Sequence, residues 1–334
     1  MANYKAKGRL SAQAYIDGVL NGNRVILSRA ITVIESHLES DKLLAKNIIQ
    51  AILPRSGNSI RIGITGVPGV GKSTFIEVFG KHIINEGHRV AILSIDPSSQ
   101  RSKGSILGDK TRMQTLSNLE SAYIRPSASG DTLGGVANKT AETMLLCEAA
   151  GYDIILIETV GVGQSETAVH DMTDFFILLM LAVAGDQLQG IKKGIMEMAD
   201  MVVINKADGD NIKNSEMARK QYQNALHMFP PSESGWMPIV TKTSATNNMG
   251  IDAIWNEIKG YTDLVVKNGY FDKNRNHQKI LWMYNNINDA LKHLFYGSKD
   301  ITSQLSLLEK QIISLEISPV RAAQDIIEIF KKTV

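Results

Sequence analysis

The chain has 334 residues, of which 43% are hydrophobic and 21% charged, as in an ordinary globular protein with a substantial core. The net charge is only +2 and both signs are interleaved, which argues against nucleic acid as the main partner. A single cysteine, Cys147, excludes an internal disulfide and a cysteine-based zinc cage, and its apolar neighbours predict a buried core residue.

The first residues contain no apolar stretch typical of a signal peptide. The most apolar run, FFILLMLAVA at 175–184, is too short to span a bilayer and suits a buried strand. We therefore expect a cytoplasmic protein that does not enter a membrane.

Residues 10–53 predict helices, because apolar residues in RVILSRAITVIESHL recur at steps of three and four. Asp41 is the expected N-cap of a following helix. Residues 54–58, PRSGN, break this pattern and predict a linker.

Residues 60–260 alternate short apolar runs with helical stretches, and this alternation predicts a doubly wound, mostly parallel α/β sheet. Most of the runs are apolar along their whole length, which is typical of strands covered on both faces. The expected strands are IRIGIT, RVAILSI, SAYIRP, DIILIE, FFILLMLAV, MVVIN and MPIVTK. In such sheets, ligands bind beyond the carboxyl ends of the strands.

The remaining chain is again helical, with amphipathic stretches at 280–295 and 304–315 and with Pro319 near the start of a last helix. The sequence thus predicts three parts: a helical N-terminal extension at 1–58, a nucleotide-binding domain at 59–260 and a helical C-terminal arm at 261–334.

The stretch GVPGVGKST matches the phosphate-loop pattern G-x-x-x-x-G-K-[ST] and lies between an expected strand and an expected helix. Its glycines let consecutive backbone N–H groups face phosphate oxygens at the positive end of the helix. Lys72 would contact the β- and γ-phosphates, Ser73 a Mg²⁺ ion and Thr74 the α-phosphate. The expected phosphate-binding residues are Gly66, Val67, Pro68, Gly69, Val70, Gly71, Lys72, Ser73 and Thr74. The alternative is a glycine-rich turn without a ligand.

The motif NKAD at 205–208 predicts that the base is guanine rather than adenine. Guanine presents two donors on one edge, and the Asp208 carboxylate can accept both, whereas adenine would present an acceptor to it. Asn205 can bond the other edge of the base, and Lys206 can cover the ring. Later in the chain, Ser244, Ala245 and Thr246 could place a backbone N–H on guanine O6.

Two strand ends between these motifs carry acidic residues that suit a metal and switch segments. Asp96 follows RVAILSI, and Glu158 opens ETVGVGQSE; both are candidate Mg²⁺ ligands, directly or through water. Asp96 could instead order the attacking water or be only a turn residue. Gly161 can offer its N–H to a γ-phosphate and lose that contact after hydrolysis. Because Val162 follows it rather than a glutamine, we expect slow hydrolysis that a partner accelerates.

Together, GVPGVGKST, SIDPSS, ETVGVGQSE, AGDQLQGIKKG and NKAD closely resemble the MeaB/ArgK type of P-loop GTPase, the bacterial relatives of the methylmalonic aciduria type A protein. The resemblance runs essentially end to end, although Gln187 stands where an acidic residue is common. It implies a homodimeric GTPase whose C-terminal helices form the dimer arm. It also implies a chaperone that gates adenosylcobalamin delivery to an acyl-CoA mutase, usually methylmalonyl-CoA mutase, and protects or reactivates it.

The resemblance also implies roles for residues that the motifs alone leave open. Residues 185–194 match a switch loop that reports nucleotide state to the mutase; from the residues alone, a solvated connection is equally possible. Lys192 matches a lysine that reaches the nucleotide when the partner is docked, and Asp109 matches a second switch acid that can move to the metal.

Three alternative functions compete with this interpretation. A nickel-inserting GTPase would need a soft-metal site, but the histidines are scattered and there is one cysteine. An ATP-dependent kinase of an amino-acid transport system conflicts with the guanine motif. A nucleotide-gated scaffold would bind GTP with only incidental hydrolysis.

Overall fold

The computed structural model describes residues 8–36, 38–95, 113–126, 133–159, 165–182 and 193–333. The chain forms two compact units, Met1–Gln278 and Lys279–Val334. The three-part division expected from the sequence remains a prediction. Among the described residues, no helix combines the length and the apolarity that crossing a bilayer requires.

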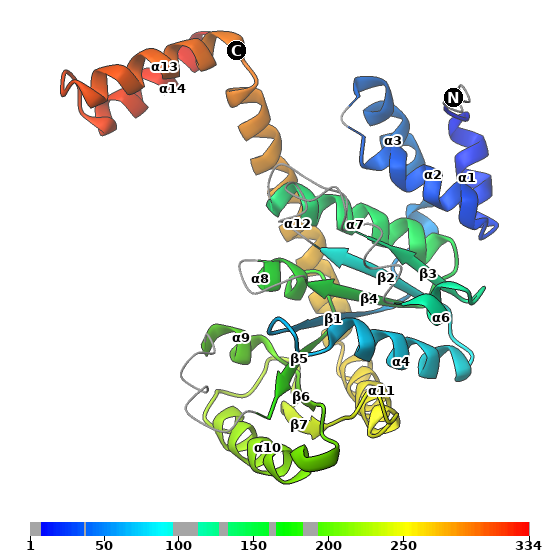
Figure 1. Ribbon diagram of the computed structural model, residues 1–334. Helices are drawn as coiled ribbons and strands as arrows, with labels where there is room; N and C mark the ends of the chain where they lie inside the picture. The colour runs from blue at the N-terminus through cyan, green and yellow to red at the C-terminus, as the bar shows by residue number, and fades with distance from the viewer. Residues whose placement is uncertain are drawn as a thin grey trace, which may run out of the picture. The chain divides into compact units, whose positions relative to one another are not determined.

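The first unit is built around a seven-stranded, all-parallel sheet with strand order β3-β2-β4-β1-β5-β6-β7 (Figure 1). All seven expected strands are present, and the doubly wound fold is confirmed. The strands are β1 (Ile60–Gly66), β2 (Val90–Ile95), β3 (Ala122–Arg125), β4 (Ile154–Thr159), β5 (Phe175–Leu181), β6 (Met201–Asn205) and β7 (Ile239–Lys242). The strands that follow β1 in the sequence, β2 to β4, lie between β1 and one edge of the sheet, whereas β5 to β7 lie between β1 and the other edge. The strand order therefore reverses its direction at β1. The carboxyl end of β1 is the switch point where ligands bind in this class of fold.

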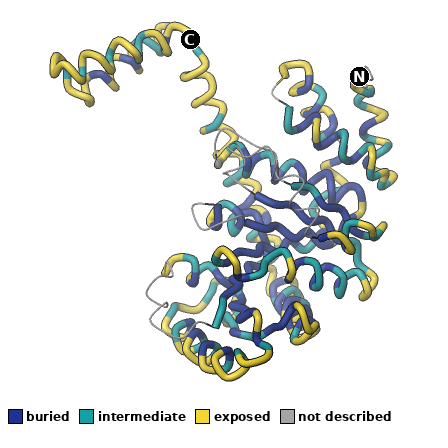
Figure 2. The backbone as a smooth tube through the Cα atoms, in the orientation of Figure 1, coloured by how far each residue is buried: buried dark blue, intermediate teal, exposed yellow. Residues whose placement is uncertain are grey.

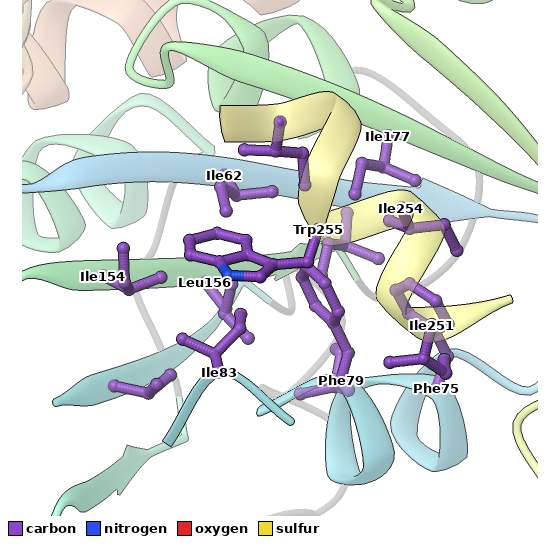
Figure 3. Packing of buried hydrophobic residues seen from close by; sticks show 14 of the residues in the cluster. Ile62, Phe75, Phe79, Ile83, Ile154, Leu156, Ile177, Ile251, Ile254 and Trp255 are labelled. Atoms are coloured by element: carbon purple, nitrogen blue, oxygen red, sulfur yellow. The ribbon is translucent and has the colours of Figure 1, made fainter. Parts of the chain in front are cut away.

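Helices cover both faces of the sheet, which explains why the strands are apolar without alternation. On one face, α4 (Lys72–Asn85) and α11 (Ile251–Lys267) pack on alternate residues of the central strands. Figure 3 shows Phe79 and Trp255 meeting there, with ring centroids 6.2 Å apart. On the other face lie α7 (Leu133–Ala149), α8 (Ser165–His170), α9 (Lys193–Met198) and α10 (Ile212–Leu226). Cys147 of α7 is fully buried and free, as expected.

The N-terminal extension forms α1 (Ala12–Leu20), α2 (Arg24–Ile34), α3 (Glu39–Ile52) and a short 3₁₀ helix, Leu53–Arg55. Helix α2 is bonded to the edge of the sheet: Arg24 donates to the Leu119 carbonyl at 3.2 Å, and the hydroxyls of Ser28 and Tyr123 are 3.1 Å apart. The extension packs mainly on α7, and these contacts connect α2 to β3 and to the segment just before it.

The expected role of Asp41 as an N-cap is wrong. Helix α3 begins at Glu39 with Leu38 as its cap, so Asp41 lies within the first turn. Its carboxylate is buried and takes two hydrogen bonds from Arg9, at 3.0 and 2.6 Å. This ion pair, rather than the helix end, accounts for an acid at this position.

The first unit ends with the first turns of α12 (Tyr270–Tyr296), which are fixed to the amino ends of the strands. Arg275 donates to Asp174 at 2.5 and 2.6 Å and to the Ser59 carbonyl at 2.7 Å. Glu148 accepts from Ser59 at 2.6 Å and from Arg61 at 2.9 Å. The segment expected to be a linker joins this buried ionic network through Gly57, whose N–H donates to Glu148 Oε2 at 2.7 Å.

The second unit continues α12 and adds α13 (Lys299–Ile313) and α14 (Pro319–Thr333), with the proline at the expected helix start. Helices α13 and α14 pack together, and Phe295 meets Phe330 with ring centroids 5.0 Å apart. Much of α12 in this unit is exposed (Figure 2), including several large apolar side chains.

The short elements of the first unit are α6 (Gln114–Ser117) and a 3₁₀ helix, Gly209–Asn211.

Candidate functional site

The phosphate loop lies at the carboxyl end of β1 and leads directly into α4, which begins at Lys72 as expected. Two of its glycines are required by close approaches as well as by backbone conformation. A Cβ on Gly66, which has φ of 153°, would lie 2.4 Å from the Leu179 carbonyl oxygen, and one on Gly71, with φ of 94°, would lie 3.0 Å from Asn205 Nδ2. Any larger residue at these two positions would strain the loop.

The other loop residues divide into anchors and exposed positions. Val70 is fully buried in the core between the sheet and α4, and Val67 packs against the same cluster. Pro68, Gly69 and Thr74 are exposed. The two valines therefore anchor the loop to the core, while its exposed residues remain accessible to a ligand.

Lys72 is half-buried, and its ammonium donates to the Gly66 carbonyl at 2.7 Å. Burial lowers the pKa of Lys72, and the carboxylates of Glu158 and then Glu166 oppose that lowering. The lysine thus folds back over its own loop as a cation with two acidic neighbours. Sequence reasoning assigned no role to Glu166, although it closes the ETVGVGQSE string.

Ser73 and Glu158 come together as the sequence predicted for a Mg²⁺ site. The Ser73 hydroxyl donates to Glu158 Oε1 at 3.4 Å, and Glu158 is buried at the end of β4. Hydroxyl and carboxylate oxygens are the donors that Mg²⁺ prefers, so this pair fits the ion. Within the described ranges, no group of three or more acidic, histidine or cysteine side chains could hold a metal. Asp96, Asp109, Gly161 and Lys192 lie outside the described residues.

The guanine-type motif follows β6, and its first two residues contact the phosphate loop. Asn205 donates its side-chain amide to the Val70 carbonyl at 2.8 Å, and Lys206 donates to the Gly69 carbonyl at 3.0 Å. Lys206 has φ of 56°, a conformation that points its side chain back over the loop and costs a non-glycine residue some strain. The expectation from the sequence placed both side chains on the base; the structure also makes them cross-links between motif and loop.

Asp208 is held by hydroxyl groups from the later segment. The Ser244 hydroxyl and, at 3.3 Å, the Thr246 hydroxyl both donate to Asp208 Oδ2. Ser244 is itself fixed by paired backbone hydrogen bonds with Met249, at 3.1 and 3.0 Å, while Ala245 is buried in the core. The carboxylate is thus oriented before any base arrives. Sequence reasoning gave these residues a backbone role only, because a hydroxyl partner 36 residues away leaves no local signal.

Three features define a P-loop GTPase. They are a phosphate loop at the switch point of a parallel sheet, a serine–carboxylate pair beside that loop, and an oriented aspartate as the last residue of N-K-x-D. The chain belongs to the family described as methylmalonyl Co-A mutase-associated GTPase MeaB, whose model matches residues 27–300. This confirms the resemblance drawn from the motifs.

Individual relatives agree with this assignment. The GTPase ArgK of Escherichia coli is 48% identical over 275 residues, which are 82% of this chain and 83% of that protein. A mitochondrial methylmalonic aciduria type A homolog of Mus musculus is 43% identical, covering 96% of this chain and 80% of its own. A crystal structure described as LAO/AO transport system kinase superposes with a TM-score of 0.77 at 35% identity, covering 98% of this chain and all of that one.

Proposed function

We propose that this chain binds GTP with Mg²⁺, hydrolyses it slowly alone and faster with a partner, and acts as a chaperone of an adenosylcobalamin-dependent acyl-CoA mutase. The observation that supports the nucleotide assignment is the Asp208 carboxylate of N-K-x-D, which accepts hydrogen bonds from the hydroxyls of Ser244 and Thr246 and is held by them. A fixed carboxylate accepts the two donors of guanine and repels the acceptor of adenine, so it selects GTP over ATP.

In the proposed mechanism the chain's residues position and stabilise the phosphates rather than form bonds to them. The loop amides of 66–74 and Lys72 would hold the β- and γ-phosphates. Ser73, Glu158 and Asp96 would hold Mg²⁺, which offsets charge on the phosphate oxygens when bound. Asp96 would alternatively order the attacking water.

The remaining roles follow from the family resemblance. Gly161 would bond the γ-phosphate until hydrolysis. Asp109 would serve as a second switch acid, and Lys192 would reach the nucleotide only in the complex with the partner.

The proposed partner follows from the family. Its description names a methylmalonyl Co-A mutase, and the mouse relative is named for methylmalonic aciduria. We propose that this chain gates adenosylcobalamin loading into such a mutase and protects or reactivates that enzyme. Methylmalonyl-CoA mutase is the partner that we propose. Adenosylcobalamin would belong to the partner enzyme, and the complex would be cytoplasmic.

We further propose that the protein is a homodimer joined through its C-terminal arm. Support comes from exposed apolar side chains on α12 at steps of three and four, the spacing of a helix-pairing seam. They are Ile280, Met283, Ile287, Leu291 and Leu294.

Nucleotide turnover with and without purified mutase tests the proposal. We expect GTP hydrolysis that the mutase stimulates, little ATP hydrolysis, and nucleotide affinity that Lys192→Ala leaves nearly intact while abolishing the stimulation. Lys193→Ala, a change of the adjacent exposed lysine, is the matched control. Equal use of ATP with transfer of phosphate to a protein would favour the kinase alternative. GTP binding without stimulated turnover would favour the scaffold.

A further inference from the structure

Strand β7 is the last strand at one edge of the sheet, with β6 beside it on one side only. The backbone N–H groups of Ile239 and Thr243 donate to carbonyls on the β6 side, at 3.4 and 2.9 Å. Successive residues of a strand point their backbone groups to opposite sides, so those of Val240 and Lys242 point away from β6. An edge of this kind is a template for pairing with a strand of another chain.

The side chain of Gln223, in α10, occupies the first position of this edge. Its Oε1 accepts from the Val240 N–H at 3.0 Å, and its Nε2 donates to the Pro238 carbonyl at 3.4 Å. The same Nε2 lies 3.1 Å from His227 Nε2. A glutamine amide carries the same donor and acceptor as a peptide group. Gln223 therefore makes the two bonds that one peptide of an added strand would make.

The other end of the edge is covered by a different element. A Cβ on Gly250 would lie 2.4 Å from the Lys242 carbonyl oxygen, so the backbone of Gly250 lies against that oxygen. The Lys242 ammonium pairs with Glu216 of α10 at 2.6 Å, and a charged side chain on an edge strand disfavours pairing. The Val240 carbonyl and the Lys242 N–H thus lie between two covered positions. With Gln223 in place, an added strand has room for one pair of hydrogen bonds rather than a run of them.

We propose that the Gln223 side chain mimics a peptide of a neighbouring strand and so prevents β7 from pairing with β7 of a second copy of this chain. Two identical edges related by a two-fold axis meet antiparallel, and each offers the other the same donors and acceptors. Met237, just before β7, is 66% exposed and adds apolar surface that this pairing would bury. Loss of the amide frees two consecutive positions of the edge, where main-chain hydrogen bonds favour strand addition.

This edge is separate from the homodimer contact proposed for the C-terminal arm, because α10 and β7 belong to the first unit. Light scattering coupled to size exclusion, over a wide range of concentrations, therefore takes the mass of the unmodified full chain as its reference. We expect the mass of Gln223→Leu to rise with concentration toward twice that reference.

Two further variants serve as controls. Gln221→Leu adds the same apolar side chain at an exposed position of α10 and should keep the reference mass. Gln223→Glu keeps an acceptor for the Val240 N–H and adds a charge to the edge, so it should keep the reference mass as well.

Hydrogen exchange of the segment 238–242 shows where any association occurs. In dilute Gln223→Leu, the Val240 N–H should exchange faster than in the unmodified chain, because its acceptor is gone. At high concentration it should exchange more slowly again, because the second copy supplies a new acceptor.

Three outcomes would overturn the proposal. They are an unchanged mass of the folded Gln223→Leu variant, equal association of Gln221→Leu, and association that leaves the Val240 N–H in fast exchange. Gln223→Leu must first show a cooperative thermal transition. Should it not fold, Gln223→Ala removes the same hydrogen bonds with a smaller side chain and takes its place.

Discussion

Asn205 and Val70 are 135 residues apart in the sequence, yet the side-chain amide of the first donates to the carbonyl of the second at 2.8 Å. The bond joins the guanine motif to the phosphate loop. Lys206 repeats the connection one residue later, on the Gly69 carbonyl. The two halves of the proposed nucleotide site are therefore one hydrogen-bonded unit.

Removing this bond should destabilise the protein even without nucleotide. Asn205→Ala leaves the Val70 carbonyl buried without its donor, and we expect a loss of about 1–3 kcal/mol in the free energy of unfolding. Denaturant unfolding measures it. Asn211→Ala removes a bond of the same kind from an exposed site, to the Lys206 carbonyl, and should cost less. Equal losses would show that the bond does not hold the loop.

Ser244→Ala should weaken base selection more than phosphate binding. The Asp208 carboxylate loses a charge-assisted hydrogen bond and with it a fixed orientation. We expect GTP affinity to fall about tenfold, equivalent to about 1.4 kcal/mol, with ATP affinity unchanged. Competition binding measures both. Thr246→Val removes the longer, exposed contact and should have a smaller effect. A parallel fall for GTP and ATP would contradict the orienting role.

Asp200 gives the fold a built-in dependence on pH. Burial raises the pKa of Asp200 to about 7, opposed in part by the hydrogen bond from the Phe176 N–H. Its ordinary pKa is 3.8, so between about pH 4 and 7 the folded chain keeps a proton that the unfolded chain releases. Stability should therefore fall by up to about 1.4 kcal/mol per pH unit across this window, and change no further above it.

Asp200→Asn should remove most of this decline, because the amide oxygen can still accept from Phe176 and carries no charge. Thermal unfolding at pH 5 and pH 8 checks this, with the variant more stable than the parent at pH 8. Asp153→Asn is the control, since Asp153 accepts the Arg89 N–H in the same way but is 47% exposed and paired with His88. An equal gain in both variants would rule out burial as the cause.

Arg275→Met should be strongly destabilising. It leaves the buried Asp174 carboxylate without its cation and removes a neighbour of Glu148, and breaking a buried pair in this way costs about 3–5 kcal/mol. Urea unfolding of the full chain measures the cost. Arg219→Met removes a cation from a solvent-exposed pair with Glu216 and should cost far less, because water screens such pairs. Similar losses in the two variants would mean that the buried network stabilises the fold no more than the exposed ion pair does.

Leu291→Glu should dissociate the proposed homodimer, because it places a charge in the middle of the apolar seam of α12. Light scattering coupled to size exclusion gives the mass directly. Asn288→Glu adds the same charge at an exposed position outside the seam and should leave the dimer intact. A parent chain that is monomeric at all concentrations would reject the dimer itself.

Much of the fold was predictable because each strand is a short apolar run between turn residues, and the doubly wound sheet buries both faces of its central strands. The phosphate loop and N-K-x-D were equally visible, since their residues act through spacing along a continuous stretch. The prediction that Asp41 is an N-cap was wrong, because a local capping rule takes no account of a distant residue such as Arg9 that binds the carboxylate.

The sequence by itself determined the strand segments, the phosphate loop and the aspartate proposed to select the base, because each is encoded by neighbouring residues. Only the tertiary structure decided which hydroxyls orient Asp208 and which carbonyls accept from Asn205 and Lys206. Those contacts link segments far apart in the chain. Their formation depends on the packing of whole helices and strands, and no local pattern records it.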